Sequence, residues 1–339
     1  MKKKLIIILM IVAVSFTSLT KISAEESRYN DFSVTPIYSE NQLNTNAGYY
    51  DLRLNENQVE TIVLRISNEG QETMNAELQI TNAVTDDNAT ANYHTQEKPS
   101  DSAVNVMTDI ASLESSSFTV GPAESIDVPI AITAPDQAFD GVVLGGVSVI
   151  ANGKSDDKVQ GTGVVSAIKY LVAIQLSMTD NVPEKELVNT AQGVKIKHDL
   201  PAYYVRISNP QSVNMKPILI QGKLYDTDGK TVIGTVNNKA GNILPDSQFD
   251  LVFDMINPNK KLKNGDYKYE VEITDGDDSW SFEDHIHVVE EVSAGINNNA
   301  KFENEKKDYF VWILSIVVGA LLVVIAILYH KLNSRKSKV

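Results

Sequence analysis

The 339-residue chain contains no cysteine. This absence excludes disulfide bonds, cysteine metal sites and a thiol nucleophile. A chain of this length buries enough apolar surface to fold without such links. The sequence also lacks a G-x-S-x-G turn and a glycine-rich phosphate loop, and its acids are too many to select a catalytic pair. We therefore expect a protein that is not an enzyme and has no cofactor.

Basic residues are scarce relative to acidic ones. The 30 Lys and Arg face 44 Asp and Glu, which gives a formal net charge of -14. Several of the basic residues lie at the two ends, so the part between them carries about -22. A surface this acidic repels nucleic acid and anionic lipid headgroups. We expect no nucleic-acid partner, and solubility is the simplest role for the charge.

Two long apolar runs lie near the ends of the chain. A basic start, the run Leu5–Val14 and small residues before Ala24 predict a secretory signal peptide over residues 1–24. Residues 310–329 contain no charge and are long enough to cross ~30 Å of hydrocarbon, which predicts a transmembrane helix. The tail 330–339 is basic and should lie in the cytoplasm. These features predict a single-pass cell-membrane protein with its N-terminal domains outside.

The C-terminal end resembles that of sortase-sorted proteins, but no L-P-x-T-G motif precedes residue 310. The two Leu-Pro pairs, Leu200–Pro201 and Leu244–Pro245, lie far upstream and lack the rest of the motif. We therefore expect the apolar segment to stay in the membrane as an anchor. An exported chain without cysteine also favours a Gram-positive bacterium.

Between the ends, apolar and polar residues alternate in several segments, including 62–66, 126–132, 267–273 and 280–288. A period of two predicts strands with one buried face. Asp228-Gly229 separates two further strand-like runs and is a hairpin signal. Many short strands with turns at intervals of roughly ten residues predict an all-β fold of the β-sandwich type.

The exported part is long enough for two domains. The polar stretch Asn152–Lys158 divides it into residues 25–152 and 159–290. The pentapeptide Leu64–Asn68 recurs as Val205–Asn209, each time after an alternating strand, which favours two tandem Ig-like sandwiches. Residues 291–309 are rich in Asn, Glu and Lys, and we expect a flexible stalk that lifts the domains off the membrane.

Three local patterns resemble metal sites, but each has a simpler interpretation. Asp226–Lys230 begins like a calcium loop, yet two of the later ligand positions hold Lys and Asn, so we interpret it as a hairpin turn. Asp275–Asp278 is also interpreted as a turn. His285 and His287 share a strand face, but no third ligand has a matching spacing. We therefore predict no metal site.

Four segments, in this order, carry a resemblance to a known family: Gly48–Leu52, Val63–Asn68, Ala138–Val147 and Lys169–Leu176. With the signal, two β domains, one anchor and a basic tail, the chain resembles the WxL-interacting proteins of low-GC Gram-positive bacteria. The resemblance implies that the first domain binds peptidoglycan and that the second contributes to binding host extracellular-matrix ligands. It also implies that the protein functions together with wall proteins that carry a WxL domain. It supplies no ligand-contact residues, so the binding residues stay unknown.

Several alternatives stay open. Phe139–Gly141 and Gly145–Gly146 suit either a ligand loop or a strand with close sheet packing, and we favour packing. The pairs Tyr49–Tyr50 and Tyr203–Tyr204 could stack on sugars, although one of each pair must face inward. Trp312-Ile-Leu spells W-x-L, but it lies in the expected membrane span.

A second class of function is also compatible with the sequence. Ig-like modules can lend a strand to a client, so a membrane-tethered extracytoplasmic chaperone or assembly factor is the alternative to a binding protein.

Overall fold

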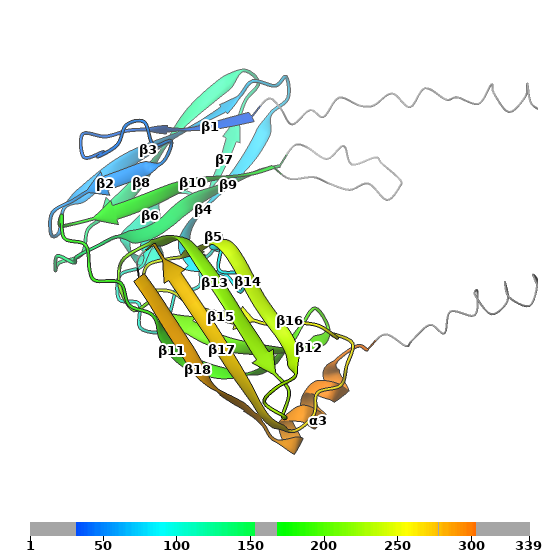
Figure 1. Cartoon of the computed structure of the whole chain (residues 1–339). Coiled ribbons are helices and arrows are strands. Elements are labelled where there is room, and N and C mark those ends of the chain that lie inside the picture. Colours follow the sequence, from blue (N-terminus) through cyan, green and yellow to red (C-terminus); the bar gives the residue numbers. More distant parts are fainter. Residues whose placement is uncertain (1–31, 153–167, 277, 303–339) are drawn as a thin grey trace, which may run out of the picture.

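The computed structural model describes residues 32–152, 168–276 and 278–302 (Figure 1). These residues form β-strands almost throughout, which confirms the all-β prediction. Within the described ranges, no helix has the length and apolar character that crossing a membrane requires. The expected signal peptide, membrane span and tail lie outside them.

The first sandwich consists of two sheets. One has the order β1-β3-β8-β6, with bounds β1 Phe32–Ile37, β3 Val59–Asn68, β8 Glu124–Thr133 and β6 Ala111–Leu113. The other has the order β2-β10-β9-β4-β5, with bounds β2 Tyr50–Arg53, β10 Ile168–Ser177, β9 Val143–Asn152, β4 Met74–Thr85 and β5 Ala91–Thr95. Strand β7, Ser117–Val120, also pairs with β4, and the short helix α2 spans Met107–Ile110.

The core of this sandwich follows the alternation in the sequence. In β3 the residues Ile62, Leu64 and Ile66 are buried, while the residues between them are more exposed. Val147 and Ile174 are buried in the second sheet and belong to the same core cluster. Each such side chain stabilises the fold by roughly 1.5–3 kcal/mol through removal from water.

Strand β10 belongs to the first sandwich, although it follows the expected division at 152–159. It pairs antiparallel with β9 from Ile168 to Leu176 and parallel with β2. Its inward residues Val172, Ile174 and Leu176 are buried in the first core. Because these apolar residues complete that core, the first sandwich extends beyond the polar stretch that suggested a boundary.

The second sandwich has a three-stranded and a five-stranded sheet. The first has the order β11-β12-β15, with bounds β11 Val188–Lys197, β12 Leu200–Ser208 and β15 Gln248–Val252. The second has the order β16-β14-β13-β17-β18, with bounds β16 Asp254–Met255, β14 Val232–Ile243, β13 Met215–Tyr225, β17 Gly265–Asp275 and β18 Asp278–Val288. The predicted hairpin turn joins β13 to β14, with Gly229 at a φ of 65° that favours glycine.

The prediction of a flexible stalk over residues 291–309 is wrong for residues 291–299, which are helical. Helix α3, Glu290–Asn299, packs Ile296 against the second core. The Asn297 side chain accepts a hydrogen bond from the backbone N–H of Leu262 and donates one to its carbonyl. The helix has no side-chain cap, and its sequence is rich in Asn. Its tertiary contacts therefore decide its fold, because isolated helices this short are marginal in water.

Candidate binding surfaces and the domain junction

The β4–β5 turn of the first sandwich reaches into the second sandwich (Figure 1). Ala89, in this turn, is 0% exposed and belongs to the core cluster of the second sandwich. Its carbonyl accepts a hydrogen bond from the backbone N–H of Asn242 at 2.8 Å. Ala89 has a φ of 54°, which is uncommon for a residue other than glycine and adds strain of about 1–2 kcal/mol. The turn is therefore part of both domains.

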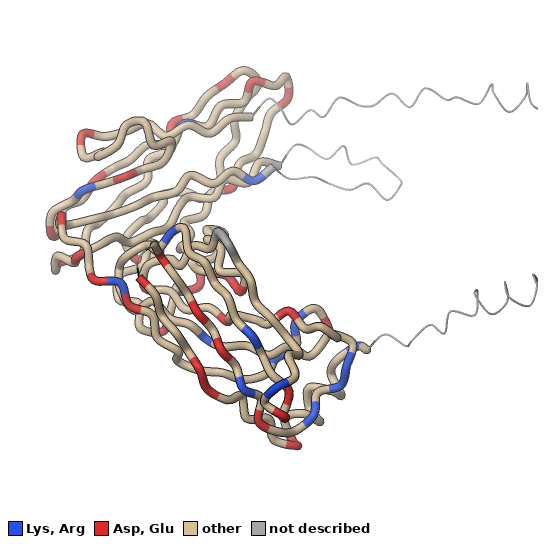
Figure 2. The backbone as a smooth tube through the Cα atoms, in the orientation of Figure 1, with Lys and Arg blue, Asp and Glu red and all other residues tan. Residues whose placement is uncertain are grey.

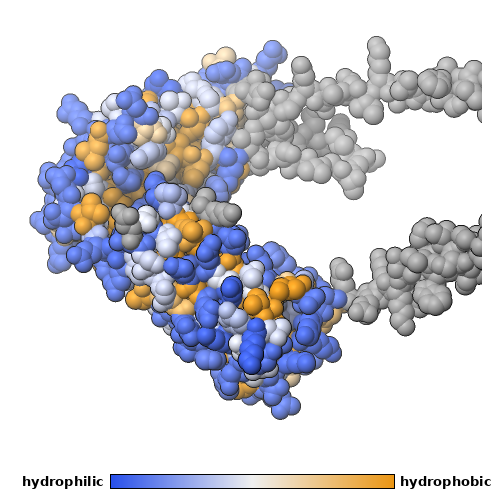
Figure 3. Space-filling view, in the orientation of Figure 1, coloured by the Kyte–Doolittle hydropathy of each residue, from blue (hydrophilic) through white to orange (hydrophobic). Residues whose placement is uncertain are grey.

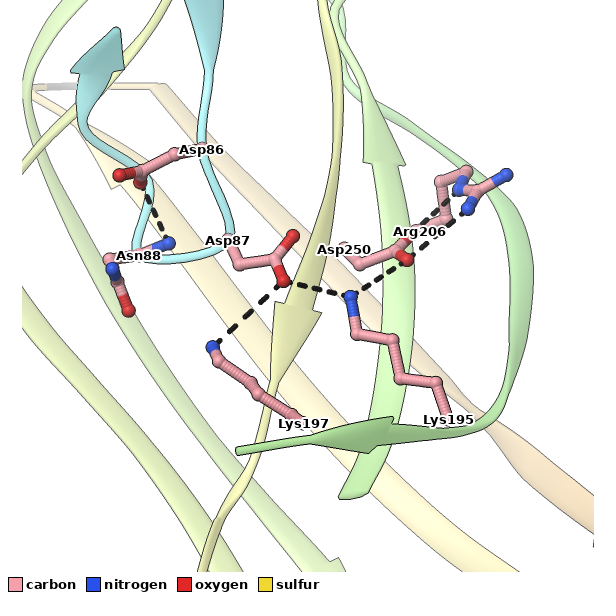
Figure 4. Close-up of polar contacts among 7 residues, drawn as sticks. All are labelled: Asp86, Asp87, Asn88, Lys195, Lys197, Arg206 and Asp250. Carbon is pink, nitrogen blue, oxygen red and sulfur yellow. Dashed lines mark hydrogen bonds and ion pairs between the residues drawn. The ribbon is translucent and has the colours of Figure 1, made fainter. Parts of the chain in front are cut away.

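A charged network surrounds this turn (Figure 4). Lys195 Nζ lies 2.8 Å from Asp87 Oδ2 and 3.0 Å from Asp250 Oδ2. Arg206 donates two hydrogen bonds to Asp250, of 2.6 Å and 3.2 Å. Burial by itself raises the pKa of Asp250, but the hydrogen bonds from Arg206 and Lys195 outweigh it and hold the pKa below its usual value. The first domain thus supplies one acid to a network built on the second.

Polar and apolar contacts complete the junction. The hydroxyls of Thr85 and Ser247 lie 2.6 Å apart, and the backbone N–H of Leu244 donates to Thr85 Oγ1 at 2.9 Å. A small apolar cluster joins the two domains, with the members Ala83, Leu144, Leu244, Tyr93 and Val142. Buried hydrogen bonds and apolar contacts at one interface favour a fixed arrangement of the sandwiches.

The F-D-G segment also lies at this junction. Gly141 has a φ of 85°, and a Cβ there would lie 2.0 Å from the Ser212 carbonyl oxygen. The backbone N–H of Val142 donates to that same oxygen at 2.8 Å. Asp140 accepts hydrogen bonds from Thr179 and Asn181. These contacts give the segment a role in joining the domains that sequence reasoning did not predict.

Gly145 and Gly146, later in the segment Ala138–Val147, serve packing inside the first sandwich. A Cβ at Gly145 would lie 2.3 Å from the Met107 Cβ, and one at Gly146 would lie 2.9 Å from the Val172 carbonyl. Both lie in β9, where glycine allows neighbouring groups to approach closely. The structure thus agrees with the packing interpretation of Gly145 and Gly146.

In each tyrosine pair one side chain is buried and the other is partly exposed, as the alternation of side chains in a strand requires. Tyr50 and Tyr203 are buried, and burial raises the pKa of both phenols. Tyr49 and Tyr204 are partly exposed. The Tyr204 ring lies 5.4 Å from Lys195 Nζ, which is within the range of a cation–π contact. Sugar stacking on Tyr49 stays an untested alternative.

Aspartates in the patterns that resemble metal sites bond to other residues of the protein. Asp228 accepts hydrogen bonds from the backbone of Lys230 and Thr231 and from the Thr231 hydroxyl, which lower its pKa to about 2. Lys185 pairs with both Asp275 and Asp278. Across the described ranges, no cluster of three or more His, Cys, Asp or Glu has the geometry to hold a metal ion.

His285 and His287 share the outer face of β18, as predicted from their spacing. His287 Nδ1 lies 2.5 Å from Asp266 Oδ1 on the neighbouring strand β17. Both imidazoles are exposed. The pair therefore belongs to a solvated sheet face.

One side of the second sandwich presents two strand edges. Among the described strands, β11 pairs only with β12, and β18 pairs only with β17. Trp280, Phe282 and Val194 are half-buried along this side. Glu283 and Asp284 are exposed on β18. Unpaired strand edges offer backbone groups to an added strand, so this side is the best candidate surface for a protein partner.

Two family models match the chain in the order in which the sandwiches occur. The WxL Interacting Protein peptidoglycan binding domain matches residues 32–151, and the WxL Interacting Protein host binding domain matches residues 159–298. A comparison with curated proteins finds no match.

Solved structures with some similarity include bacterial chaperones. The Escherichia coli chaperone DraB is 13% identical, with 69% of this chain and 95% of that chain covered and a TM-score of 0.27. The Salmonella enterica SafA pilin in complex with the SafB chaperone is 14% identical, with 70% of this chain and 99% of that chain covered and a TM-score of 0.30. TM-scores this low carry no argument about function.

The family models together cover both sandwiches and most of the chain. Both are binding domains, and neither is catalytic. The chain therefore belongs to the WxL Interacting Protein family.

Proposed function

We propose that this cell-surface binding protein contacts peptidoglycan through its first sandwich and holds a wall protein with a WxL domain through its second. The observation that carries the proposal is the match of both family domains, in order, to two sandwiches that share a buried junction. A fixed junction lets one molecule present a wall contact and a partner contact at a set distance. Host extracellular-matrix ligands are a further proposed target of the second sandwich.

The proposal includes a membrane anchor in a Gram-positive cell. Its support is the charge-free segment 310–329, the basic tail that follows it and the signal-like start of the chain. Protease applied to cells without their wall should trim the protein to a small membrane stub. A full-length chain that survives this treatment would contradict the topology.

Peptidoglycan binding is tested with fragments that respect the observed strands. A fragment of residues 25–182 includes β10, whereas one that ends at 152 leaves β9 without a neighbour that buries part of the core. We expect residues 25–182 to sediment with purified peptidoglycan as well as residues 25–302 do. If both remain in the supernatant at low and physiological salt, the assignment to the first sandwich is wrong.

For the WxL partner we propose recognition by the open edges of β11 and β18. Backbone pairing and apolar contact depend little on ionic strength, whereas attraction to the acidic surface is screened as the Debye length falls from ~10 Å at 0.1 M to ~3 Å at 1 M salt. Affinity for a purified WxL domain should therefore change less than about tenfold, or roughly 1.4 kcal/mol, between these conditions. A larger loss would assign the contact to the charged surface.

The same open edges favour one alternative, a tethered extracytoplasmic chaperone or assembly factor. Such a protein would bind an unfolded client strand and release it on folding. A folded WxL domain that binds the ectodomain at equilibrium favours the binding protein. Binding that is limited to unfolded chains favours the alternative.

A further inference from the structure

The end of the second sandwich that faces away from the first domain carries α3 (Figure 1). The described chain ends there, just after Lys301, whose backbone N–H donates to the Asp199 carbonyl in the β11–β12 turn. The loop of residues 256–264, between β16 and β17, lies at the same end because Leu262 bonds to Asn297 of α3. We call this segment the lysine loop.

The chain length places this end near the membrane. Because α3 is fixed to the sandwich, only residues 303–309 separate the described chain from the charge-free segment that begins at 310. A connection of about eight residues reaches at most about 29 Å when fully extended. The expected stalk of residues 291–309 would have reached more than twice as far. The lysine loop is therefore held close to the bilayer surface wherever residues 310–329 span it.

The lysine loop presents three exposed cations, Lys260, Lys261 and Lys263. No ion pair involves any of the three within the part of the chain that the structure describes. The loop is held in shape, because Leu262 is buried and the Lys263 carbonyl accepts a hydrogen bond from the Tyr267 hydroxyl at 2.9 Å. Figure 2 shows basic residues gathered along the chain beside α3.

Several acids at the same end already have partners. Asp199 pairs with Lys301, Asp266 pairs with His287, and Asp228 accepts three hydrogen bonds within its own turn. Glu290 and Glu291 lie in the first turn of α3, where the helix N-terminus favours acids. Within the described ranges none of these acids forms an ion pair with a lysine of the loop, so the three ammonium groups can contact an external anion.

Apolar side chains are also exposed at this end of the sandwich. Ile256, at the start of the lysine loop, is 60% exposed, and Val292 of α3 is also exposed. Figure 3 shows hydrophobic surface on the part of the second sandwich near β16. Lysines next to exposed apolar residues suit the headgroup region of a bilayer, where both kinds of group find partners.

We propose that the lysine loop rests on the anionic phospholipid surface of the membrane and so sets the orientation of the two sandwiches. This inference rests on the membrane anchor of the proposed function. Juxtamembrane lysines are attracted to anionic lipid within about a Debye length, and the short connection allows the lysine loop to reach that range. The net charge of the whole chain predicts repulsion, but the lysine loop itself carries three lysines and no acid.

The test uses the full chain in vesicles and its lack of native cysteine. An Asn259→Cys variant carries a donor fluorophore in the lysine loop, and a Gln71→Cys variant carries it in the β3–β4 turn of the first sandwich. The acceptor is attached to a lipid. With phosphatidylglycerol in the vesicles, we expect energy transfer from position 259 to rise at least twofold over pure phosphatidylcholine at 0.1 M salt, and to fall again at 1 M. Transfer from position 71 should stay low.

Charge variants complete the test. Changing Lys260, Lys261 and Lys263 to Glu should abolish the response, whereas the same change at the exposed Lys98, Lys216 and Lys223 should keep it. Protein lost from vesicles in an alkaline wash would contradict the anchor. If the protein stays in the vesicles but energy transfer from position 259 changes neither with phosphatidylglycerol nor with the lysine-to-glutamate variant, this inference is wrong. The membrane anchor of the proposed function would still stand. A response to soluble poly(glycerol phosphate) but not to lipid would assign the lysines to a wall polymer and overturn the lipid assignment.

Discussion

Asn68 and Asn209 perform the same task in the two sandwiches. Asn68 Nδ2 donates to the carbonyls of Glu72 and Val120, and Asn209 Nδ2 donates to those of Val213 and Leu244. Each Oδ1 accepts the backbone N–H two residues further on. Both side chains are buried. The pentapeptide that recurs in the sequence is therefore a structural repeat, in which each asparagine closes the turn after a core strand.

Replacing either asparagine should destabilise its own sandwich. Asn68→Ala or Asn209→Ala leaves buried carbonyls without donors, which costs about 1–3 kcal/mol each. Chemical denaturation of the ectodomain measures the loss. Asn264→Ala, at an exposed position, is the control and should change stability by less than about 0.5 kcal/mol. Equal effects at all three positions would contradict the shared role.

The repeat also places an arginine opposite an aspartate in each sandwich, with unequal surroundings. Arg65 and Asp127 are half-exposed, whereas Asp250, the partner of Arg206, is largely buried and also pairs with Lys195. We expect Arg65→Ala to change stability little, because solvent screens an exposed ion pair. Arg206→Ala should cost about 2–3 kcal/mol, because it leaves a carboxylate partly buried with one partner fewer. A double-mutant cycle of Arg206 with Asp87 should show coupling, and additive effects would contradict the network.

Gly141→Ala should loosen the domain junction. The new Cβ meets the Ser212 carbonyl at 2.0 Å, and the positive φ adds strain of about 1–2 kcal/mol. Gly229→Ala is the matched control, because its φ is also positive but no atom lies within 4 Å of the Cβ position. We expect only the first variant to unfold in two separate calorimetric transitions. Identical single transitions in both would show that the contact with Ser212 is dispensable.

The β13–β14 turn should weaken in acid. Hydrogen bonds from Thr231 and Lys230 lower the pKa of Asp228 to about 2, below the value of 3.8 for a free side chain. A lowered pKa means that the carboxylate stabilises the turn above about pH 4 and that this stabilisation is lost as pH falls toward 2. Carboxyl ¹³C titration checks the pKa. Asp228→Asn should lower the melting temperature at pH 7 more than at pH 2, whereas Asp136→Asn, at an exposed position, should change it little at either pH.

Much of the architecture follows from local patterns in the sequence. The alternation at Ile62–Ile66 and at Tyr267–Ile273 predicted strands with one buried face, and the structure buries those residues. Asp228-Gly229 predicted the β13–β14 hairpin. These features are readable because side-chain direction in a strand and glycine in a turn are set by the residue itself and its immediate neighbours.

Other features depend on partners that are distant in the sequence. The candidate partner surface at β11 and β18 could not be read from the chain, because an edge is defined by the strands that do not pair with it. The helical form of residues 290–299 depends on the contacts of Ile296 and Asn297 rather than on helix propensity.

By itself, the sequence determined the all-β character, strands such as those at 62–66 and 267–273, the β13–β14 hairpin turn and the family. Only the tertiary structure decided that β10 completes the first core, that Ala89 is buried in the second and that Gly141 meets Ser212. The physical reason is that short-range patterns set the conformation and the buried face of each segment. Which segments meet depends on the shape, hydrogen bonds and charge of surfaces that form only when the whole chain has folded.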